Sequence, residues 1–211
     1  MTQRKLVGLL PAAGMARRLG IGTPKELVIH RDKPVIDHSV AHLVGVGVQR
    51  VVVVTRPGKE AVLAHLRATW PALRFDEVTQ DGEIGNLIDA LRAAIVALES
   101  DDVYLLFPDT YIAPDPFSFR SADNELTLLC HDAGDRWANF GVVDPVSRRV
   151  VEKPAMKPTS TLCWGAAIWT ERFTRRLATA GTLTDAINDA DWCYAQTIDS
   201  YEDIGLGADA T

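Results

Sequence analysis

Apolar runs and helical spacings alternate along the first half of the chain. Four short runs rich in β-branched residues, KLVGLL, RVVVVT, RFDEVT and VYLLF at 103–107, predict buried strands. Between these runs, apolar residues recur at the spacing of one helix face. The clearest sets are Ile36, Val40, Leu43 and Val44, then Val62, Leu63 and Leu66, then Leu87, Leu91, Ala94, Ile95 and Leu98. The alternation of strand and helix predicts a parallel sheet with helices on both faces.

The pattern changes after residue 120. The segments ELTLLCH, NFGVVDP, RRVVEKP and LCWGAAIW predict strands whose connections are too short for crossover helices. Helical spacing returns in ERFTRRLAT and TLTDAINDA, and WCYAQTI predicts one more strand. A mixed sheet therefore extends the parallel one. No repeat or linker interrupts residues 1–211, so we expect a single α/β domain.

The composition is that of a compact globular protein. Of the 211 residues, 47% are hydrophobic and 24% are charged, which excludes the disordered and coiled-coil classes. The net charge of −6 argues against duplex nucleic acid as a partner, because such proteins usually present a basic surface. The longest uncharged stretch, residues 158–170, is too short to span a membrane. We therefore expect no nucleic-acid partner and no membrane partner.

The three cysteines predict the redox compartment. Cys130, Cys163 and Cys193 are odd in number, lie far apart and have apolar neighbours. Free buried thiols in a reducing compartment have this distribution. We therefore predict a cytoplasmic protein.

Several common catalytic motifs are missing. Gly58-Lys59 is followed by Glu60 and not by Ser or Thr, which excludes a P-loop, and neither G-x-G-x-x-G nor G-x-S-x-G occurs. His38 and His42 are four residues apart, but no Glu follows His38 as the zinc motif H-E-x-x-H requires. These absences count against hydrolase, redox and zinc chemistry.

The loop after the first strand has the composition of an anion-binding loop. Small residues at Ala12, Ala13 and Gly14 allow the backbone to approach a ligand, and their N–H groups can face its oxygens. Arg18 and Lys25 add positive charge to the same loop. The alternative is a solvated connection between strand and helix that carries incidental cations.

Two aspartates are candidates for a metal site. Asp109 follows the apolar strand VYLLFP, so its carboxylate lies at the carboxyl edge of the sheet, where ligands bind in open parallel sheets. Asp203 follows another strand-like run and can approach it. Carboxylates without a nearby His or Cys suit Mg²⁺, with substrate phosphates completing its shell. The alternative for each aspartate is a role in a turn or helix cap.

The second half contributes a charged strand end and an aromatic strand. Glu152 and Lys153 end the strand RRVV just before Pro154, and consecutive strand residues point to opposite sides. One of them can then accept sugar hydroxyls while the other contacts a phosphate. Trp164, beside Gly165, is a candidate pocket floor. The alternatives are an exposed ion pair for the former and an ordinary core position for the tryptophan.

Taken together, these segments resemble the sugar-1-phosphate nucleotidyltransferases from about Lys5 to the last residues of the chain. The matching segments are PAAGMARRL with TPKEL, TQDGEIG, PDTYI, NFGVVD with VVEKP, CWGAAIW and YEDIG. The resemblance implies a three-layer, Rossmann-like nucleotidyltransferase fold of the GT-A-like type with a mixed, mostly parallel central sheet. It also implies a nucleotide-binding half at about 1–112 and a sugar-phosphate-binding half at about 113–211.

The resemblance assigns roles to residues of this chain. The catalytic cations it implies are Arg18, Lys25 and Lys153. The nucleotide-binding residues it implies are Ala12, Ala13, Gly14, Gln80 and Gly85, of which Gln80 and Gly85 match the pair that reads a uracil or thymine ring. The sugar-phosphate-binding residues it implies are Gly141, Glu152, Lys153, Trp164 and Gly165. Asp109 and Asp203 would hold Mg²⁺.

The sequence departs from the family pattern at several positions. Ala16 and Arg17 stand where the family has Gly and Thr, and Asp109 is flanked by Pro and Thr instead of Gly and Asn. The first loop is more similar to uridylyltransferases and methylerythritol-phosphate cytidylyltransferases, whereas EKP and YEDIG are more similar to thymidylyltransferases.

The resemblance predicts a Mg²⁺-dependent enzyme, a monomer or small homo-oligomer, that joins a nucleoside triphosphate to a sugar-1-phosphate and releases pyrophosphate. The favoured nucleotides are dTTP and UTP. The alternatives are cytidylyl transfer to a non-sugar phosphate or phosphonate, and a catalytically silent regulatory protein that binds nucleotide sugars.

Overall fold

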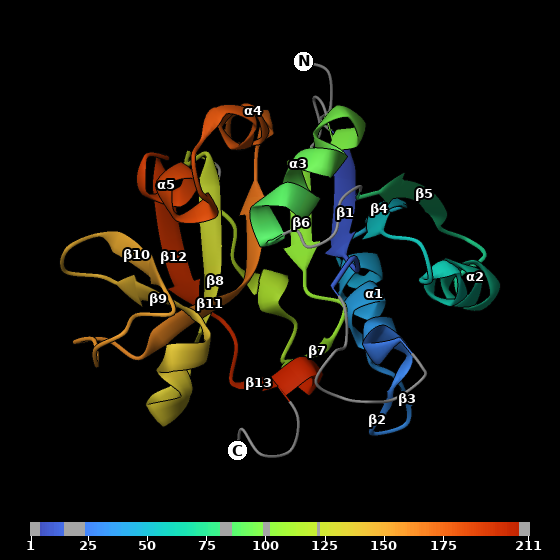
Figure 1. Ribbon diagram of the computed structural model, residues 1–211, viewed down its shortest axis with the longest axis horizontal. Helices are drawn as coiled ribbons and strands as arrows, with labels where there is room; N and C mark the ends of the chain where they lie inside the picture. The colour runs from blue at the N-terminus through green and yellow to red at the C-terminus, as the bar shows by residue number, and fades with distance from the viewer. Residues whose placement is uncertain (1–4, 15–23, 81–85, 99–101, 122, 207–211) are drawn as a thin grey trace.

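A nine-stranded mixed sheet forms the centre of the molecule in a computed structural model, which describes residues 5–14, 24–80, 86–98, 102–121 and 123–206 (Figure 1). The strands are β1 (Leu6–Pro11), β2 (Ile29–His30), β3 (Lys33–Pro34), β4 (Arg50–Thr55), β5 (Arg74–Thr79), β6 (Asp102–Leu106), β7 (Thr110–Ala113), β8 (Leu126–Asp132), β9 (Gly141–Asp144), β10 (Arg149–Glu152), β11 (Leu162–Trp169), β12 (Trp192–Gln196) and β13 (Ser200–Asp203). The α-helices are α1 (Val35–Gly45), α2 (Glu60–Thr69), α3 (Leu87–Leu98), α4 (Glu171–Thr179) and α5 (Leu183–Asn188). Four short 3₁₀ helices are η1 (Lys25–Leu27), η2 (Pro116–Ser118), η3 (Gly134–Asn139) and η4 (Ile204–Leu206).

The strand order of the main sheet separates the two halves of the chain. The order is β10-β9-β11-β6-β1-β4-β5, with β8 pairing both β11 and β12. Strands β5, β4, β1 and β6 are mutually parallel, and β11 then runs antiparallel to β6. The predicted change from parallel to mixed pairing after residue 120 is therefore confirmed.

Helices cover both faces of this sheet. Leu10 and Val53 belong to the core under α1 and α2, whereas their neighbours Leu9 and Val52 belong to the core under α3, α4 and α5. All four side chains are fully buried. Burial of one such side chain contributes roughly 1.5–3 kcal/mol, so strands that are apolar on both faces are stable only between two helix layers. The three-layer α/β arrangement predicted from the sequence is confirmed.

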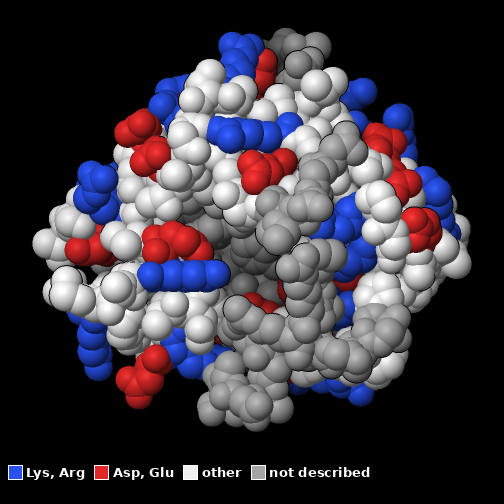
Figure 2. All heavy atoms as spheres, viewed as in Figure 1, with Lys and Arg blue, Asp and Glu red and all other residues white. Residues whose placement is uncertain are grey.

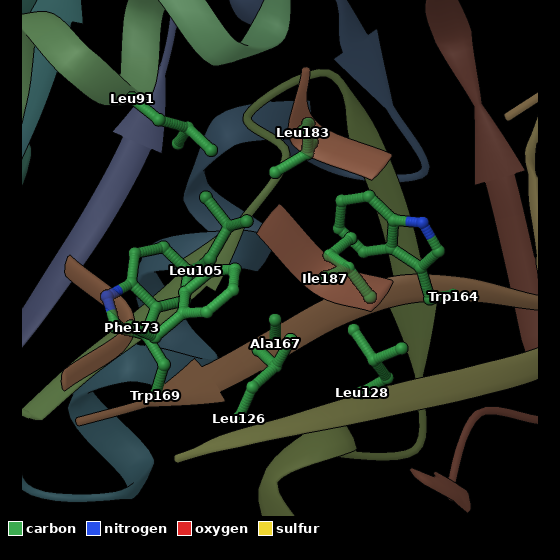
Figure 3. Close-up of a pocket in the computed structure, with 10 residues that line it drawn as sticks. All are labelled: Leu91, Leu105, Leu126, Leu128, Trp164, Ala167, Trp169, Phe173, Leu183 and Ile187. Carbon is green, nitrogen blue, oxygen red and sulfur yellow. The ribbon is translucent and has the colours of Figure 1, made fainter. Parts of the chain in front are cut away.

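The core under α3, α4 and α5 contains one small void of about 10 Å³, lined only by apolar and aromatic side chains (Figure 3). A space of this size and polarity has no partner for a water molecule. Trp164 lies at its edge, with the six-membered ring beside Leu183 and Ile187 and the indole nitrogen on the far side of the ring. One side of Trp164 therefore packs in the core.

A second, two-stranded sheet was not predicted. Strand β13 pairs antiparallel with β7, and the register places Asp203 opposite Thr110. Asp203 thus ends a strand of its own, β13, and lies directly beside the residue that follows Asp109. A short hairpin of β2 and β3 was also missed. Strands of two to four residues give too short a pattern to be recognised in the sequence.

The cysteines agree with the prediction of free thiols. All three cysteines are free; Cys130 and Cys163 are buried, and Cys193 is half-buried. Burial raises the pKa of the Cys163 thiol to about 12, so it stays protonated at neutral pH. Among the described residues, no helix has the length and apolar character needed to cross a bilayer.

Candidate active site

A cleft of about 660 Å³ opens where strands of both halves end. Figure 2 shows this face of the molecule hollowed near its centre, with acidic and basic side chains side by side at the rim. Most of the residues singled out in the sequence line the cleft: Ala13, Gly14, Lys25, Gln80, Asp109, Gly141, Glu152, Lys153, Trp164 and Asp203. Their predicted roles stay predictions, but the chain folds so that these side chains share one space.

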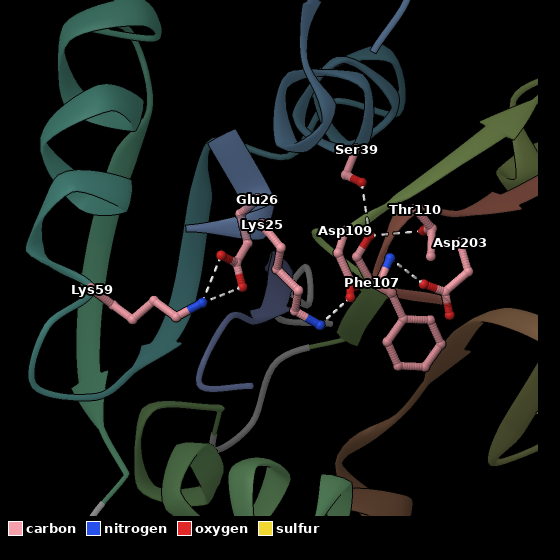
Figure 4. Close-up of polar contacts among 9 residues, drawn as sticks. Lys25, Glu26, Ser39, Lys59, Phe107, Asp109, Thr110 and Asp203 are labelled. Carbon is pink, nitrogen blue, oxygen red and sulfur yellow. Dashed lines mark hydrogen bonds and ion pairs between the residues drawn. The ribbon is translucent and has the colours of Figure 1, made fainter. Parts of the chain in front are cut away.

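The floor of the cleft, defined here as Lys25, Asp109 and Asp203, gathers three charged groups. The Lys25 ammonium forms an ion pair with the Asp109 carboxylate (Figure 4). Asp203 Oδ1 accepts a hydrogen bond of 2.7 Å from the backbone N–H of Gly205. A Cβ at Gly205 would lie 3.0 Å from Asp109 Oδ2, 3.0 Å from Asp203 Oδ1 and 3.4 Å from Lys25 Nζ. All three groups therefore converge on one point, which only a glycine leaves open.

A hydrogen-bonded turn after β6 holds Asp109 in place. The carbonyl oxygen of Phe107 accepts from the Thr110 hydroxyl at 2.9 Å and from the Ser39 hydroxyl of α1 at 3.1 Å (Figure 4). The backbone N–H of Ile204 donates to the Asp109 carbonyl at 3.0 Å. The turn is thus fixed from both sides, by α1 and by the segment that follows β13.

The charges of the floor stabilise one another. Burial alone lowers the pKa of Lys25, but the nearby carboxylates, Asp109 foremost, outweigh it and raise the pKa above its usual value. Lys25 is therefore a permanent cation at neutral pH. Two carboxylates, one from the turn after β6 and one from the end of β13, are also the donor set that suits Mg²⁺, which usually binds one or two carboxylates together with substrate phosphates. No third acidic, histidine or cysteine side chain joins them within the described residues.

The acceptor end of the cleft, defined here as Gly141, Glu152 and Trp164, is a close contact between two strands and an indole. Glu152 lies opposite Gly141 in the β9–β10 pair. A Cβ at Gly141 would overlap Trp164 Nε1 and lie 2.9 Å from Glu152 Oε2. Trp164 Nε1 is buried and has no hydrogen-bond partner among the described residues. Burial raises the pKa of Glu152, against the lowering effect of the Lys153 charge.

Lys153 does not follow the expected strand alternation. Its φ of 43° takes the chain out of β10, and its backbone N–H donates to the Phe140 carbonyl at 3.0 Å. Glu152 and Lys153 both line the cleft. The prediction that they point to opposite sides is therefore wrong, because Lys153 no longer has strand geometry.

The end of the cleft at Gln80, where the sequence predicts that the nucleotide binds, is called the nucleotide end and begins where β5 stops. The backbone N–H of Gln80 donates to the Thr55 carbonyl at 2.8 Å, which continues the pairing with β4 by one residue. The Gln80 side chain is 5% exposed, and its Nε2 has no partner among the described residues. A buried amide of this kind can donate to a ligand acceptor.

Two predicted residues that the structure describes, Ala12 and Gly165, do not line the cleft. Ala12 is fully buried in the core, and its N–H donates to the Leu10 carbonyl at 3.0 Å. A Cβ at Gly165 would overlap the Tyr201 ring, so the missing side chain makes room for Tyr201. The predicted contact of Gly165 with a sugar stays a prediction. Arg18 and Gly85 lie outside the described residues.

Several cleft residues were missed in the sequence. Tyr201 lines the cleft and stacks on buried His131 with a centroid distance of 4.2 Å. The segment 181–184 lines it as well, just where Thr182 caps α5 in a capping box with Asp185. The T-x-x-D spacing was the available signal for that helix start, but nothing in the sequence indicates that it borders the cleft.

Comparison with known proteins finds a matching family and several similar proteins. The family described as MobA-like NTP transferase domain matches residues 8–118. Bifunctional protein GlmU of Xanthobacter autotrophicus is 34% identical over 110 residues, which are 52% of this chain and 24% of that protein. The CMP-5′-(3-aminopropyl)phosphonate synthase of Streptomyces rubellomurinus is 34% identical over 107 residues, 49% of this chain and 17% of that protein. The chain thus spans a quarter or less of the length of these relatives.

A solved structure extends the similarity to nearly the whole chain. A putative glucose-1-phosphate thymidylyltransferase from Bacillus anthracis, solved in complex with sucrose, superposes with a TM-score of 0.83. The match covers 95% of this chain and 90% of that one, at 18% sequence identity. At this identity the likeness establishes the fold, a mixed α/β nucleotidyltransferase fold.

Proposed function

The chain belongs to the MobA-like NTP transferase domain family, and on that premise we propose that it is an enzyme that transfers a nucleotidyl group to a sugar-1-phosphate and releases pyrophosphate. The favoured donors are dTTP and UTP. The observation that carries this proposal is the convergence of Lys25, Asp109 and Asp203 on the floor of one cleft, between a nucleotide end and an acceptor end. Nucleotidyl transfer needs such a centre, because it brings two polyanions together.

The reaction is an in-line attack of the acceptor phosphate on the α-phosphorus of the triphosphate. The attacking oxygen is already ionised at neutral pH, so no general base is required. The protein has to position both substrates and offset the charge that accumulates between them. Two unit charges of like sign at 4 Å cost about 4 kcal/mol at an effective dielectric of about 20, so several cations are needed.

Different residues of the cleft position the two substrates and offset their charge. Lys25 contacts the triphosphate and Lys153 contacts the acceptor phosphate. Asp109 and Asp203 are the residues that would hold Mg²⁺. When bound, this ion would supply the charge that offsets repulsion between the phosphates. Arg18 belongs to the same proposal on the strength of the sequence alone.

The acceptor end supports a hydroxyl-bearing acceptor. A sugar hydroxyl both donates and accepts hydrogen bonds, and the pair of Glu152 carboxylate and Trp164 N–H offers one partner of each kind. An unpaired buried N–H costs about 1–3 kcal/mol, so a ligand that pairs it recovers this cost on binding. The three free thiols further support a cytoplasmic site of action.

A second candidate function keeps the reaction and changes both substrates. The similarity to a CMP-5′-(3-aminopropyl)phosphonate synthase favours transfer from CTP to a phosphonate or other non-sugar phosphate.

Pyrophosphate release distinguishes these functions. The protein is incubated with Mg²⁺ and every pairing of dTTP, UTP or CTP with a hexose-1-phosphate, a non-sugar phosphate or an alkyl phosphonate. Release with dTTP or UTP and a hexose-1-phosphate supports the first candidate, and release with CTP and a phosphonate or non-sugar phosphate supports the second. Release with no pairing, combined with binding of a nucleotide sugar, would leave only the regulatory role.

A further inference from the structure

A buried ion pair lies directly behind the floor of the cleft. Lys59 Nζ donates to both carboxylate oxygens of Glu26, at 2.7 and 2.6 Å. The side chain of Glu26 is fully buried and that of Lys59 is 8% exposed. Neither residue lines the cleft. Lys59 is the lysine of the Gly58-Lys59-Glu60 segment, which lacks the Ser or Thr of a P-loop. The sequence therefore assigns its buried charge no role in binding phosphate.

Such a pair holds two segments together at a high cost in desolvation free energy. Removing two charges from water costs more than their attraction often returns, and apolar replacements of similar size are frequently as stable. Burial accordingly raises the pKa of Glu26, with Lys59 acting in the opposite direction. A stabilising role alone does not account for the pair. Its geometry indicates instead that the pair orients the segment that carries Glu26.

The pair is connected to the floor by adjacency along the chain. Glu26 and Lys25 are consecutive residues of the single turn η1. Their side chains diverge, that of Glu26 toward Lys59 and that of Lys25 toward Asp109 (Figure 4). Lys59 precedes α2 and so belongs to the β4–α2 connection. The two ion pairs therefore fix η1 between the β4–α2 connection and the turn after β6.

Leu27 of η1 packs against the core under α1 and α2. Among the described residues, the backbone hydrogen bonds of η1 are local: the N–H of Leu27 donates to Pro24 at 2.9 Å, and the N–H of Val28 to Lys25 at 3.2 Å. The local bonds shape the turn, and the two ion pairs are the contacts that hold its charged side chains in place. The Glu26 carboxylate, with two hydrogen bonds to one buried ammonium, fixes both position and direction.

We propose that the Lys59–Glu26 ion pair is a positioning device that sets the Lys25 ammonium at the reacting phosphates. Lys59 also neutralises the carboxylate next to Lys25, so that the Lys25 charge is directed toward the cleft. This inference rests on the proposed function, in which Lys25 contacts the triphosphate. Neither Glu26 nor Lys59 touches a substrate, so both act through Lys25.

The test is a double variant that removes both charges and keeps the volume, Glu26→Leu with Lys59→Met. We expect a melting temperature within a few degrees of wild type, because no buried charge is left without a partner. We expect kcat to fall at least tenfold, since a small misplacement of a charged group can cost up to about a hundredfold in rate. The KM for the acceptor should stay unchanged, because the acceptor end is untouched. A folded double variant with wild-type kcat would overturn the inference.

A control uses an ion pair with a buried carboxylate away from the cleft. Glu125 is 1% exposed and accepts from Nε of Arg176 on α4 at 2.6 Å, and it also pairs with exposed Arg172 at 3.2 Å. Glu125→Leu with Arg176→Met should change the melting temperature to a similar extent and leave kcat unchanged. Equal losses of kcat in the two double variants would overturn the inference, since they would report a general effect of stability.

Two further arms keep the inference separate from the proposed function. Should the first double variant not fold, Glu26→Gln replaces it, and a tenfold loss of kcat supports the inference whereas wild-type kcat overturns it. A wild-type protein that is inactive with every substrate pair counts against the proposed function. The crystal structure of the double variant then decides the inference: Lys25 displaced from Asp109 supports it, and Lys25 still paired with Asp109 overturns it.

Discussion

The floor of the cleft and its two ends differ in whether their polar groups have partners. On the floor, Lys25 is paired with Asp109, and Asp203 accepts from the backbone. At the ends, Gln80 Nε2 and Trp164 Nε1 are buried with no partner among the described residues. The strand order sets these regions apart, because Gln80 follows the edge strand β5 while Trp164 lies on β11, beyond the central β6 and β1.

This difference shows which part of the cleft keeps its geometry without a ligand. Paired charges hold the floor in its geometry before any substrate arrives. An unpaired buried polar group costs about 1–3 kcal/mol in the free protein, and a ligand that pairs it recovers that cost. Substitutions on the floor should therefore lower both stability and turnover, whereas substitutions at the ends should weaken substrate binding at little cost in stability.

The largest effect is expected from Asp109→Asn. The substitution leaves the Lys25 ammonium without its ion-pair partner and removes one carboxylate from the floor, at almost no change in volume. Turnover should fall by about 10³-fold, the cost of losing one well-placed electrostatic group. Pyrophosphate release and the urea unfolding midpoint should both decrease. In Asp135→Asn, whose carboxylate is fully exposed, both should stay as in wild type. Near-normal turnover of Asp109→Asn would contradict the assignment of the floor.

His131 also has a buried ring nitrogen, Nε2, without a partner among the described residues, and it predicts a loss of stability in acid. Burial lowers the pKa of His131 from 6.5 to about 4. Below pH 6.5 the unfolded chain binds a proton that the folded chain refuses, so stability falls as the pH decreases from 6.5 toward 4. At about 1.4 kcal/mol per pKa unit, the full effect is about 3 kcal/mol.

His131→Phe isolates this contribution. The substitution keeps a ring against Tyr201, and its unfolding midpoint should depend less on pH between 7 and 4 than that of wild type. Carboxylates that titrate in the same range are common to both proteins and cancel in the comparison. Parallel pH profiles would show that His131 takes up a proton in the folded state.

Trp164→Phe tests the acceptor end. It removes the indole N–H but keeps an aromatic ring, so the KM for the acceptor should rise about 3- to 10-fold, the worth of one neutral hydrogen bond. The KM for the nucleotide should not change. With an acceptor that lacks the contacted hydroxyl, wild type and variant should have the same KM. Trp192→Phe, on β12 outside the cleft, is the matched control, and an equal rise there would refute the assignment.

The smallest effect is expected from Gln80→Leu. The nucleotide KM should rise about threefold for the loss of one neutral hydrogen bond, and the acceptor KM should not change. Because Gln80 Nε2 has no partner among the described residues, the unfolding midpoint should be at or above that of wild type. A clear drop of the midpoint would mean that the nucleotide end is satisfied within the free protein, and the contrast with the floor would then fail.

The fold was predictable where a segment carries its own pattern. RVVVVT becomes β4, buried on both faces, and the spacing of Leu91, Ala94 and Leu98 becomes the buried face of α3. By contrast, TYIA and SYED are four-residue segments that become strands only because they pair with each other. Their structure depends on tertiary contact across the chain, which no local pattern records.

The identity of the site residues was easier to predict from the sequence than their arrangement in space. Residue type and motif brought Lys25, Asp109 and Asp203 together before their proximity was known. The ion pair of Glu26 and Lys59 was not foreseen, because the two residues are 33 positions apart and each has the sequence context of an ordinary surface charge. Gly165 was assigned to the ligand, whereas its actual neighbour is Tyr201, whose position depends on the unforeseen strand β13.

The pairing of β7 with β13 also sets when, during synthesis, the protein acquires its floor. Asp109 follows β6 directly and is therefore made together with the central parallel strands. Asp203 follows only after every strand of the main sheet has been made. A nascent chain can therefore assemble its main sheet while it still lacks one of the two carboxylates, and its floor is complete only after that sheet has been made.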